Sequence, residues 1–208
     1  MTIFALVLIL SVFVIFLALL GMLIALLTRR WVRLKQLALF VGFYASVYAL
    51  LLVSLALLSP QQVLAMGQLR CFDDWCASVE RVEVQPAIGR VQARGAFYIV
   101  TIQVSSRAKR ISQRALDAGV YLLDEQGKRY DASIQGQQAL EAAGRAGQPL
   151  NSLVDAGGSF TTTTVFDLPL SSAQPGLVIT HGAFPGIIII GDDQSFLHKP
   201  TIIQLTSP

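Results

Sequence analysis

The chain opens with two long apolar runs that a short basic stretch separates. Ile3–Leu27 and Leu37–Leu58 are 25 and 22 residues long, and neither run contains an ionisable side chain. At about 1.5 Å of helical rise per residue, each can cross a bilayer hydrocarbon core of about 30 Å. Ser59 and Pro60 end the second run, because proline disfavours a helical residue before it. The pattern predicts a hairpin of two transmembrane helices over residues 1–59.

The basic stretch predicts which way this hairpin faces. Thr28–Lys35 carries Arg29, Arg30, Arg33 and Lys35, and short loops rich in arginine and lysine stay on the cytoplasmic side. We therefore expect a cytoplasmic loop at 28–35 and a multi-pass protein of the inner (cytoplasmic) membrane with both termini outside. A cleaved signal peptide is disfavoured, because the first run has no basic n-region, exceeds the usual 7–15 apolar residues and precedes no Ala-x-Ala site.

Small residues recur within both runs at a spacing of four. Gly21 and Ala25 form one such pair, and Gly42 and Ser46 form the other. Gly21 and Gly42 lie at the same distance from the basic stretch, so the two helices can approach closely at this depth. The alternative is that these residues are simply common in apolar helices and have no packing role.

Beyond residue 60 the pattern of apolar and polar positions changes to a period of two. In Ala96–Val104 both sides of the alternation are largely apolar, which is typical of a central strand covered on both faces. Glycine in Asp124–Gly127 predicts a hairpin turn, and Gln135–Ala146 favours one or two helical turns. The remaining predicted strands are 78–84, 120–123, 128–132, 159–167, 176–180, 187–190 and 201–205. These elements predict an antiparallel, immunoglobulin-like β-sandwich over 77–208.

Charge separates the two halves of the chain. All 13 acidic residues follow Ser59, together with 12 of the 16 basic ones, so residues 60–208 carry 12 − 13 = −1. The overall excess of +3 therefore comes from the basic stretch. Nucleic-acid binding is not expected, because it requires basic residues concentrated on the folded domain.

The chain has two cysteines, and they stand close together after a juxtamembrane tether. The segment 60–76 ends in Cys71-Phe-Asp-Asp-Trp-Cys76. This spacing matches neither a redox CxxC nor a zinc site, and an extracytoplasmic compartment is oxidising. A local disulfide is therefore predicted, with a redox or metal role as the alternative.

The segment Phe97–Thr180 carries motifs that resemble a known family. After the central strand, the motif residues are Leu122, Asp124, Gly127, Tyr130, Val165, Phe166, Asp167 and Pro169. The segment is similar to the telokin-like, immunoglobulin-fold domain of unknown function found in bacterial secreted, lipid-anchored and membrane-anchored proteins. The chain departs from that pattern at Ser105–Ser106 and at Asp155–Gly158. The resemblance implies the sandwich fold and no catalytic residue.

Three clusters are candidates for chemistry. Asp192, Ser195 and His198 in the 191–198 loop superficially suggest a hydrolase triad, but eight consecutive residues rarely reach that geometry and no Gly-x-Ser-x-Gly elbow is present. A divalent cation at Asp192 and Asp193 is a further alternative, although the loop offers few oxygen ligands. The simplest interpretation is a turn between the last two strands.

The other two clusters are candidates for recognition. The cystine loop presents Phe72, Asp73, Asp74 and Trp75, where an aromatic pair can form a binding tip or cover the open end of the sandwich. One basic patch follows the central strand, and it can bind anionic headgroups or an acidic polymer or remain a solvated loop. This patch consists of Arg107, Lys109, Arg110 and Arg114.

The sequence thus predicts a membrane-anchored, non-enzymatic binding or scaffolding module without a cofactor. Its expected partners are the lipid bilayer and a protein or cell-envelope component. Two alternatives remain: an accessory subunit that contacts a membrane complex through its hairpin, and a hydrolytic or metal-dependent enzyme that uses the 191–198 loop.

Overall fold

The computed structural model describes residues 3–72, 74–170, 172, 174–182, 186–192 and 194–205. The chain divides into two compact units, one of residues 1–60 with 183–200 and one of residues 61–182 with 201–208. The sequence led us to expect one continuous outer domain over 77–208. Residues 183–200 instead belong to the unit that contains the two long helices.

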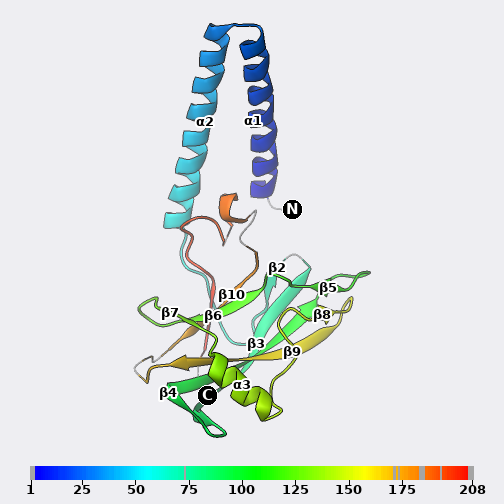
Figure 1. Ribbon diagram of the computed structural model, residues 1–208, viewed down its shortest axis with the longest axis vertical. Helices are drawn as coiled ribbons and strands as arrows, with labels where there is room; N and C mark the ends of the chain where they lie inside the picture. The colour runs from blue at the N-terminus through cyan, green and yellow to red at the C-terminus, as the bar shows by residue number, and fades with distance from the viewer. Residues whose placement is uncertain are drawn as a thin grey trace. The chain divides into compact units, whose positions relative to one another are not determined.

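The helical unit contains α1 (Ile3–Leu27) and α2 (Trp31–Leu58) (Figure 1). Both helices are long and apolar enough to cross a membrane. The turn between them is shorter than the predicted loop 28–35, because no glycine or proline prevents Trp31–Lys35 from continuing as helix. Arg29 adopts a left-handed φ of 51° at this turn. Ser59 then caps α2 in extended conformation, as predicted from Pro60.

The two long helices pack through small residues of α1. Ser11, Ala18 and Ala25, which recur every seven residues, are buried, and the hydroxyls of Ser11 and Tyr44 lie 2.7 Å apart across the helices. A seven-residue repeat on one face is the usual pattern of a left-handed helix pair.

The predicted pairing of Gly21 with Gly42 is not found. A Cβ added to Gly21 would lie 3.2 Å from a methyl group of Leu37, so Gly21 does face α2. A Cβ on Gly42 would meet no atom within 4 Å, and Ser46 is exposed. The prediction placed both glycines at one depth because it counted from a loop over 28–35. Since α2 already begins at Trp31, Gly42 lies 11 residues from its start, whereas Gly21 lies six residues from the end of α1.

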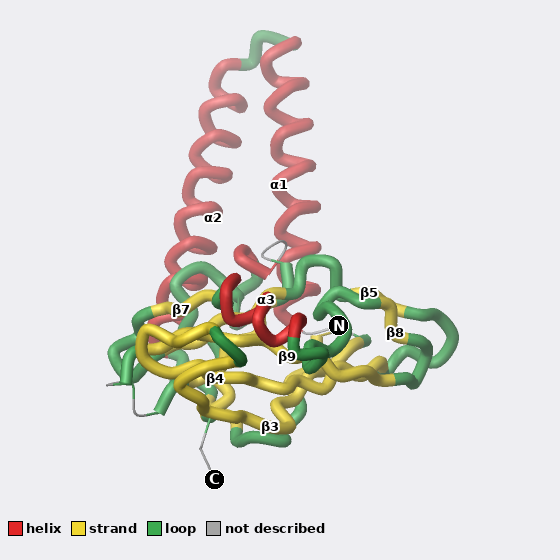
Figure 2. Tube along the Cα trace, turned by 60° about the horizontal axis from the view of Figure 1, so that its bottom comes forward, coloured by secondary structure: helices red, strands yellow, loops and turns green. Residues whose placement is uncertain are grey.

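The second unit is a β-sandwich, as predicted (Figure 2). Among the described residues, one sheet has the strand order β1-β11-β10-β6-β7 and the other β2-β3-β4-β9, while β5 and β8 form a separate ribbon. The pairs are antiparallel except for β1 with β11, which is parallel. The strands are β1 (Val63–Leu64), β2 (Arg70–Phe72), β3 (Trp75–Ile88), β4 (Val91–Ser106), β5 (Gln113–Arg114), β6 (Gly119–Leu123), β7 (Arg129–Asp131), β8 (Leu153–Val154), β9 (Ser159–Leu168), β10 (Gly176–Thr180) and β11 (Ile202–Gln204).

Strand β4 is covered on both faces, as its apolar pattern predicted. Val100 and Ile102 point into the core between the sheets, where they meet Leu122, Phe166 and Leu177. Its other face carries Phe97 and Ile99, which pack with Leu140 of the helix α3 (Ile134–Ala142) in a second cluster. Ser133 caps this helix by accepting a hydrogen bond from the Gly136 amide at 3.1 Å.

Two further sequence predictions need correction. The tether 60–76 contains β1, which pairs with β11, because Val63 and Leu64 can join the open edge of that sheet. The predicted strand 187–190 is a 3-10 helix, Gly186–Ile188. Its isoleucines favour a strand, but the segment has no pairing partner among the described strands.

Candidate functional site

The two aspartates of the family motifs have structural roles. The Asp124 carboxylate accepts hydrogen bonds from the amides of Gln126 and Lys128 and from the Tyr130 hydroxyl, at 3.0, 2.8 and 3.0 Å. Desolvation raises the pKa of Asp124, but these hydrogen bonds outweigh it, so the pKa lies below its ordinary value. Gly127, with φ of 78°, closes the predicted turn.

The second motif aspartate ties β9 to β4. Asp167 accepts hydrogen bonds from the amides of Arg94, at 3.1 Å, and Gly95, at 3.4 Å. Gly95 permits this approach, because a Cβ there would lie 2.2 Å from the Leu168 carbonyl oxygen. These carboxylates therefore hold turns and strands together in this chain.

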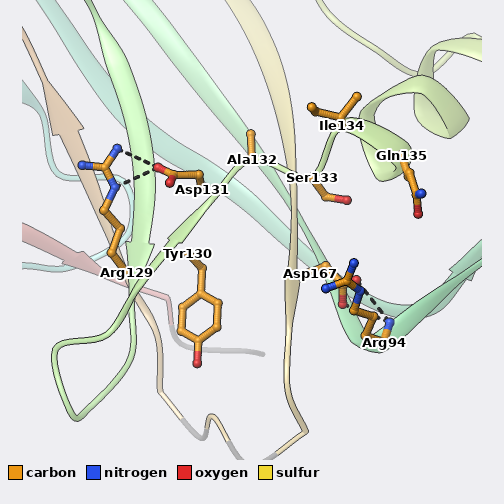
Figure 3. Close-up of a pocket in the computed structure, with 9 residues that line it drawn as sticks. All are labelled: Arg94, Arg129, Tyr130, Asp131, Ala132, Ser133, Ile134, Gln135 and Asp167. Atoms are coloured by element: carbon orange, nitrogen blue, oxygen red, sulfur yellow. Dashed lines mark hydrogen bonds and ion pairs between the residues drawn. The ribbon is translucent and has the colours of Figure 1, made fainter.

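Asp167 also lines a polar groove of about 460 Å³ beside α3 (Figure 3). Arg94, Arg129, Asp131 and Gln135 line it as well. Asp131 is paired with Arg129 at 2.6 Å and Asp167 with backbone amides. Both carboxylates are thus already engaged, and the groove does not present a pair of free carboxylates for acid–base chemistry.

The cystine loop differs from the predicted recognition tip. Cys71 and Cys76 form the predicted disulfide across β2 and β3. Phe72 and Trp75 stack with ring centroids 4.6 Å apart, but both are buried in the main core. These aromatic side chains cover the end of the sandwich, which was the alternative interpretation, and Asp73 lies outside the described residues.

A histidine–aspartate pair completes this aromatic cluster. The His181 ring lies 5.7 Å from Phe72 and 5.6 Å from Trp75, and its Nδ1 is 2.9 Å from an Asp117 carboxylate oxygen. This cluster could not be predicted from the sequence, because His181 and Asp117 are far from each other and from the cystine along the chain. The apolar ring contacts and the paired carboxylate indicate a packing role.

The loop 191–198 does not form a catalytic triad. The Ser195 hydroxyl is buried and has no hydrogen-bond partner, and Nδ1 of His198 lies 2.8 Å from the Lys199 carbonyl oxygen. The hydrogen bond between nucleophile and base that such a site needs is therefore absent in this described part of the chain. No group of three potential metal ligands occurs among the described residues, and Asp193 is outside them.

The basic patch is the candidate site that stays accessible. Arg107, Lys109, Arg110 and Arg114 are all exposed, and none of their side chains forms an ion pair with a described residue. They lie in the loop after β4 and in β5. We call Arg107–Leu116 the basic tip.

Apolar side chains accompany these cations, which the sequence analysis missed. Ile111 and Leu116 are 64% and 71% exposed, and Leu153 of the paired strand β8 is 54% exposed. The signal was present in the sequence, because Ile111 lies between Arg110 and Arg114 and Leu116 follows Arg114 by two residues. Cations beside exposed aliphatic groups fit an anionic surface that has apolar portions.

The structure brings the basic tip and the cystine loop together. The Asp74 carbonyl oxygen accepts a hydrogen bond from the Arg107 amide at 2.6 Å, and its carboxylate accepts one from the Gln113 side chain at 3.0 Å. Asp155 similarly accepts from the Ser112 hydroxyl at 3.0 Å. The disulfide-closed turn therefore supports the base of the tip.

Comparisons with known proteins give no family for this chain. No family of known proteins matches its sequence, and no curated protein matches it. It resembles a conserved hypothetical protein from Bacillus anthracis with 13% identity and a TM-score of 0.43, covering 56% of this chain and 89% of the other. A secreted protein from Mycobacterium tuberculosis, MPT63, gives 14% identity, a TM-score of 0.43 and coverage of 60% and 92%.

A third solved structure gives a similar result. An uncharacterized β-sandwich protein from Clostridium difficile 630 has 8% identity and a TM-score of 0.42, with coverage of 71% of this chain and 96% of the other. TM-scores below 0.5 carry no argument about fold or function. The sandwich is established here by the strand pairing itself.

Proposed function

We propose that this protein is a membrane-anchored, non-enzymatic module whose extracytoplasmic sandwich binds an anionic component of a bacterial cell envelope through the basic tip. α1 and α2 form the anchor, with the basic turn in the cytoplasm and the sandwich outside, in the periplasm. The structural roles of Asp124 and Asp167 support membership of the sandwich in the telokin-like family.

The observation that carries this proposal is the basic tip itself. Four exposed cations and two exposed aliphatic side chains gather in the basic tip, although residues 60–208 as a whole, the tip included, carry a net charge of −1. Such a concentration attracts anionic surfaces, at about 1 kcal/mol for each charge that comes near the surface. The disulfide supports the same placement, because disulfides persist in oxidising compartments.

Binding by the reconstituted full-length protein tests this function. In nanodiscs of zwitterionic lipid, we expect the protein to bind vesicles containing phosphatidylglycerol or a soluble acidic polysaccharide, and the two ligands distinguish a headgroup from a polymer. Replacing Lys109 and Arg110 by glutamine should weaken binding by about 30-fold, from two charges at about 1 kcal/mol each.

A matched variant controls for the loss of charge alone. Replacing Arg90 and Arg94 by glutamine also removes two exposed positive charges, but outside the basic tip. This variant should bind within about twofold of wild type. Equal binding by all three proteins, or no binding by wild type to either ligand, would overturn the proposal.

A second candidate function uses the exposed face of α2. Gly42 and Ser46 leave this face open to another helix, as an accessory subunit of a membrane complex requires. Gly42→Leu should then abolish co-purification with a partner, whereas Phe43→Leu should not. Undiminished co-purification of the Gly42→Leu protein would remove this candidate.

A further inference from the structure

The connection between β10 and β11 contains a segment that belongs to the helical unit. We call Gly186–His198 the outer loop. Residues 183–200 group with α1 and α2, and the Tyr48 hydroxyl donates a hydrogen bond to the Ile188 carbonyl oxygen at 2.7 Å, across 140 residues of sequence. Figure 1 shows the 3-10 helix of this loop, in orange, between the lower ends of α1 and α2.

The register of the helix pair gives the depth of this contact. The hydrogen bond between Ser11 and Tyr44 places these residues at the same level. Counting along both antiparallel helices from that pair, Ile3 at the start of α1 lies level with Leu52. Tyr48 is one turn inside that level, about 6 Å along the axis. If α1 begins near the outer boundary of the hydrocarbon, Ile188 lies near that boundary too.

Several backbone polar groups of the outer loop are hydrogen-bonded, as a position near the hydrocarbon requires. The Ile189 amide donates to the Gly186 carbonyl at 3.0 Å, the Phe196 amide to the Ile187 carbonyl at 3.0 Å, and Tyr48 satisfies the Ile188 carbonyl. Backbone that enters hydrocarbon must have its polar groups paired, because no water is available there. At Ile187, Ile188 and Ile189, one backbone polar group of each residue is thus hydrogen-bonded, which lowers the cost of placing this segment in hydrocarbon.

Four apolar side chains of the loop are partly exposed. Ile187, Ile188, Phe196 and Leu197 are 38%, 37%, 52% and 53% exposed. In water, these partly exposed apolar side chains would be unfavourable. Because Tyr48 holds the loop against an apolar helix of membrane-spanning length, lipid is the occupant that covers this surface.

We propose that the outer loop is a third membrane element, which dips into the outer leaflet beside α2 while its polar residues stay at the headgroups. This inference rests on the proposed membrane anchor. It gives the four-isoleucine run a role that a β-strand or an enzyme loop does not, because neither needs a contact with Tyr48 of α2.

Site-directed fluorescence in proteoliposomes tests this insertion. Neither cysteine is free in wild type, so an introduced cysteine is the sole thiol that reacts with a fluorophore. We expect a label at Ile188→Cys to be quenched by lipids with a nitroxide on the acyl chain. A label at Leu170→Cys, an exposed leucine of the sandwich unit, should show no such quenching.

A third label distinguishes two negative results: an outer loop that does not insert, and a helix pair that does not span the membrane. Leu50→Cys places the fluorophore on the exposed side of α2. If the label at 50 is quenched but the label at 188 behaves like that at 170, the outer-loop inference is overturned and the anchor stands. If the label at 50 is not quenched either, the proposed anchor fails and the inference with it.

The tyrosine contact gives a second readout. Tyr48→Phe removes the donor to the Ile188 carbonyl, and an unpaired carbonyl in hydrocarbon is disfavoured. It should therefore raise the rate at which a membrane-impermeant thiol reagent labels Ile188→Cys by about fivefold or more. Tyr44→Phe, which removes the bond to Ser11 instead, is the matched control. Equal labelling in both backgrounds would exclude Tyr48 as the residue that holds the loop in the membrane.

Discussion

Reduction of the Cys71–Cys76 disulfide should weaken the sandwich by a small and calculable amount. The cross-link closes a loop of six residues between β2 and β3. On the chain-entropy model, a loop of that length contributes about 2 kcal/mol to the free energy of unfolding. With a urea dependence of about 2 kcal/mol per molar, the midpoint of unfolding should fall by about 1 M.

The assay is urea unfolding of the full-length protein in detergent. Trp75 is 3% exposed in the core next to the cystine, so its fluorescence reports unfolding once Trp31 is replaced by phenylalanine. Comparing the oxidised and reduced forms of this one protein keeps every side chain in place. The Cys71→Ala/Cys76→Ala variant is the control, because reductant should leave its midpoint unchanged.

Two results would show that the disulfide does not stabilise the sandwich by loop closure alone. If the oxidised and reduced proteins unfold at the same urea concentration, the disulfide does not stabilise the sandwich and must be explained by a redox or binding role. If reduction unfolds the domain without urea, the disulfide contributes far more than loop closure allows, and Phe72 and Trp75 depend on it for their packing.

Other perturbations follow from single contacts. Leu140→Ala should lower the free energy of unfolding by about 3 kcal/mol, since Leu140 is fully buried between α3 and the sheet. Ile134→Ala, at a position 75% exposed on the same helix, should change it by less than about 0.5 kcal/mol. Asp124, whose pKa is lowered by folding, stabilises the protein above its ordinary pKa of 3.8 and loses this effect as the pH falls through the folded pKa. Urea midpoints measured from about pH 5 downwards should therefore fall more steeply in wild type than in Asp124→Asn. Gly95→Ala should destabilise by about 2 kcal/mol or more in the same assay, because its Cβ would collide with the Leu168 carbonyl.

The sequence predicted elements whose pattern is set by local chemistry. Period-two alternation identified β3, β4 and β9, and the Asp124–Gly127 turn has the expected left-handed glycine. The two apolar runs became α1 and α2 because uncharged stretches of that length favour helix over any other regular structure. In each case the information lies within a few neighbouring residues.

Features that depend on distant contacts could not be predicted in this way. Ile187–Ile190 has the composition of a strand, but the Tyr48 hydroxyl and the loop's own turns hold it as a 3-10 helix and an adjoining bend. Likewise, aromatic residues such as Phe72 and Trp75 occur both at exposed binding tips and in cores. Their residue types therefore could not show which of the two applies, because this depends on the residues that pack against them. The direction in which Gly42 points depends on helix rotation, which composition does not fix.

The proposed function requires one orientation of the chain in the membrane, with the basic turn inside and the sandwich outside. Cysteines introduced at Thr28, in the turn, and at Gln126, in an exposed loop of the sandwich, can be treated in intact cells with a membrane-impermeant thiol reagent. Intact-mass spectrometry then reports both labelling and whether the first helix is retained. We expect the Gln126→Cys protein to be labelled at its full-length mass, and the Thr28→Cys protein to be labelled only after the membrane is permeabilised. Labelling at 28 but not at 126, or a mass that lacks α1, would contradict it.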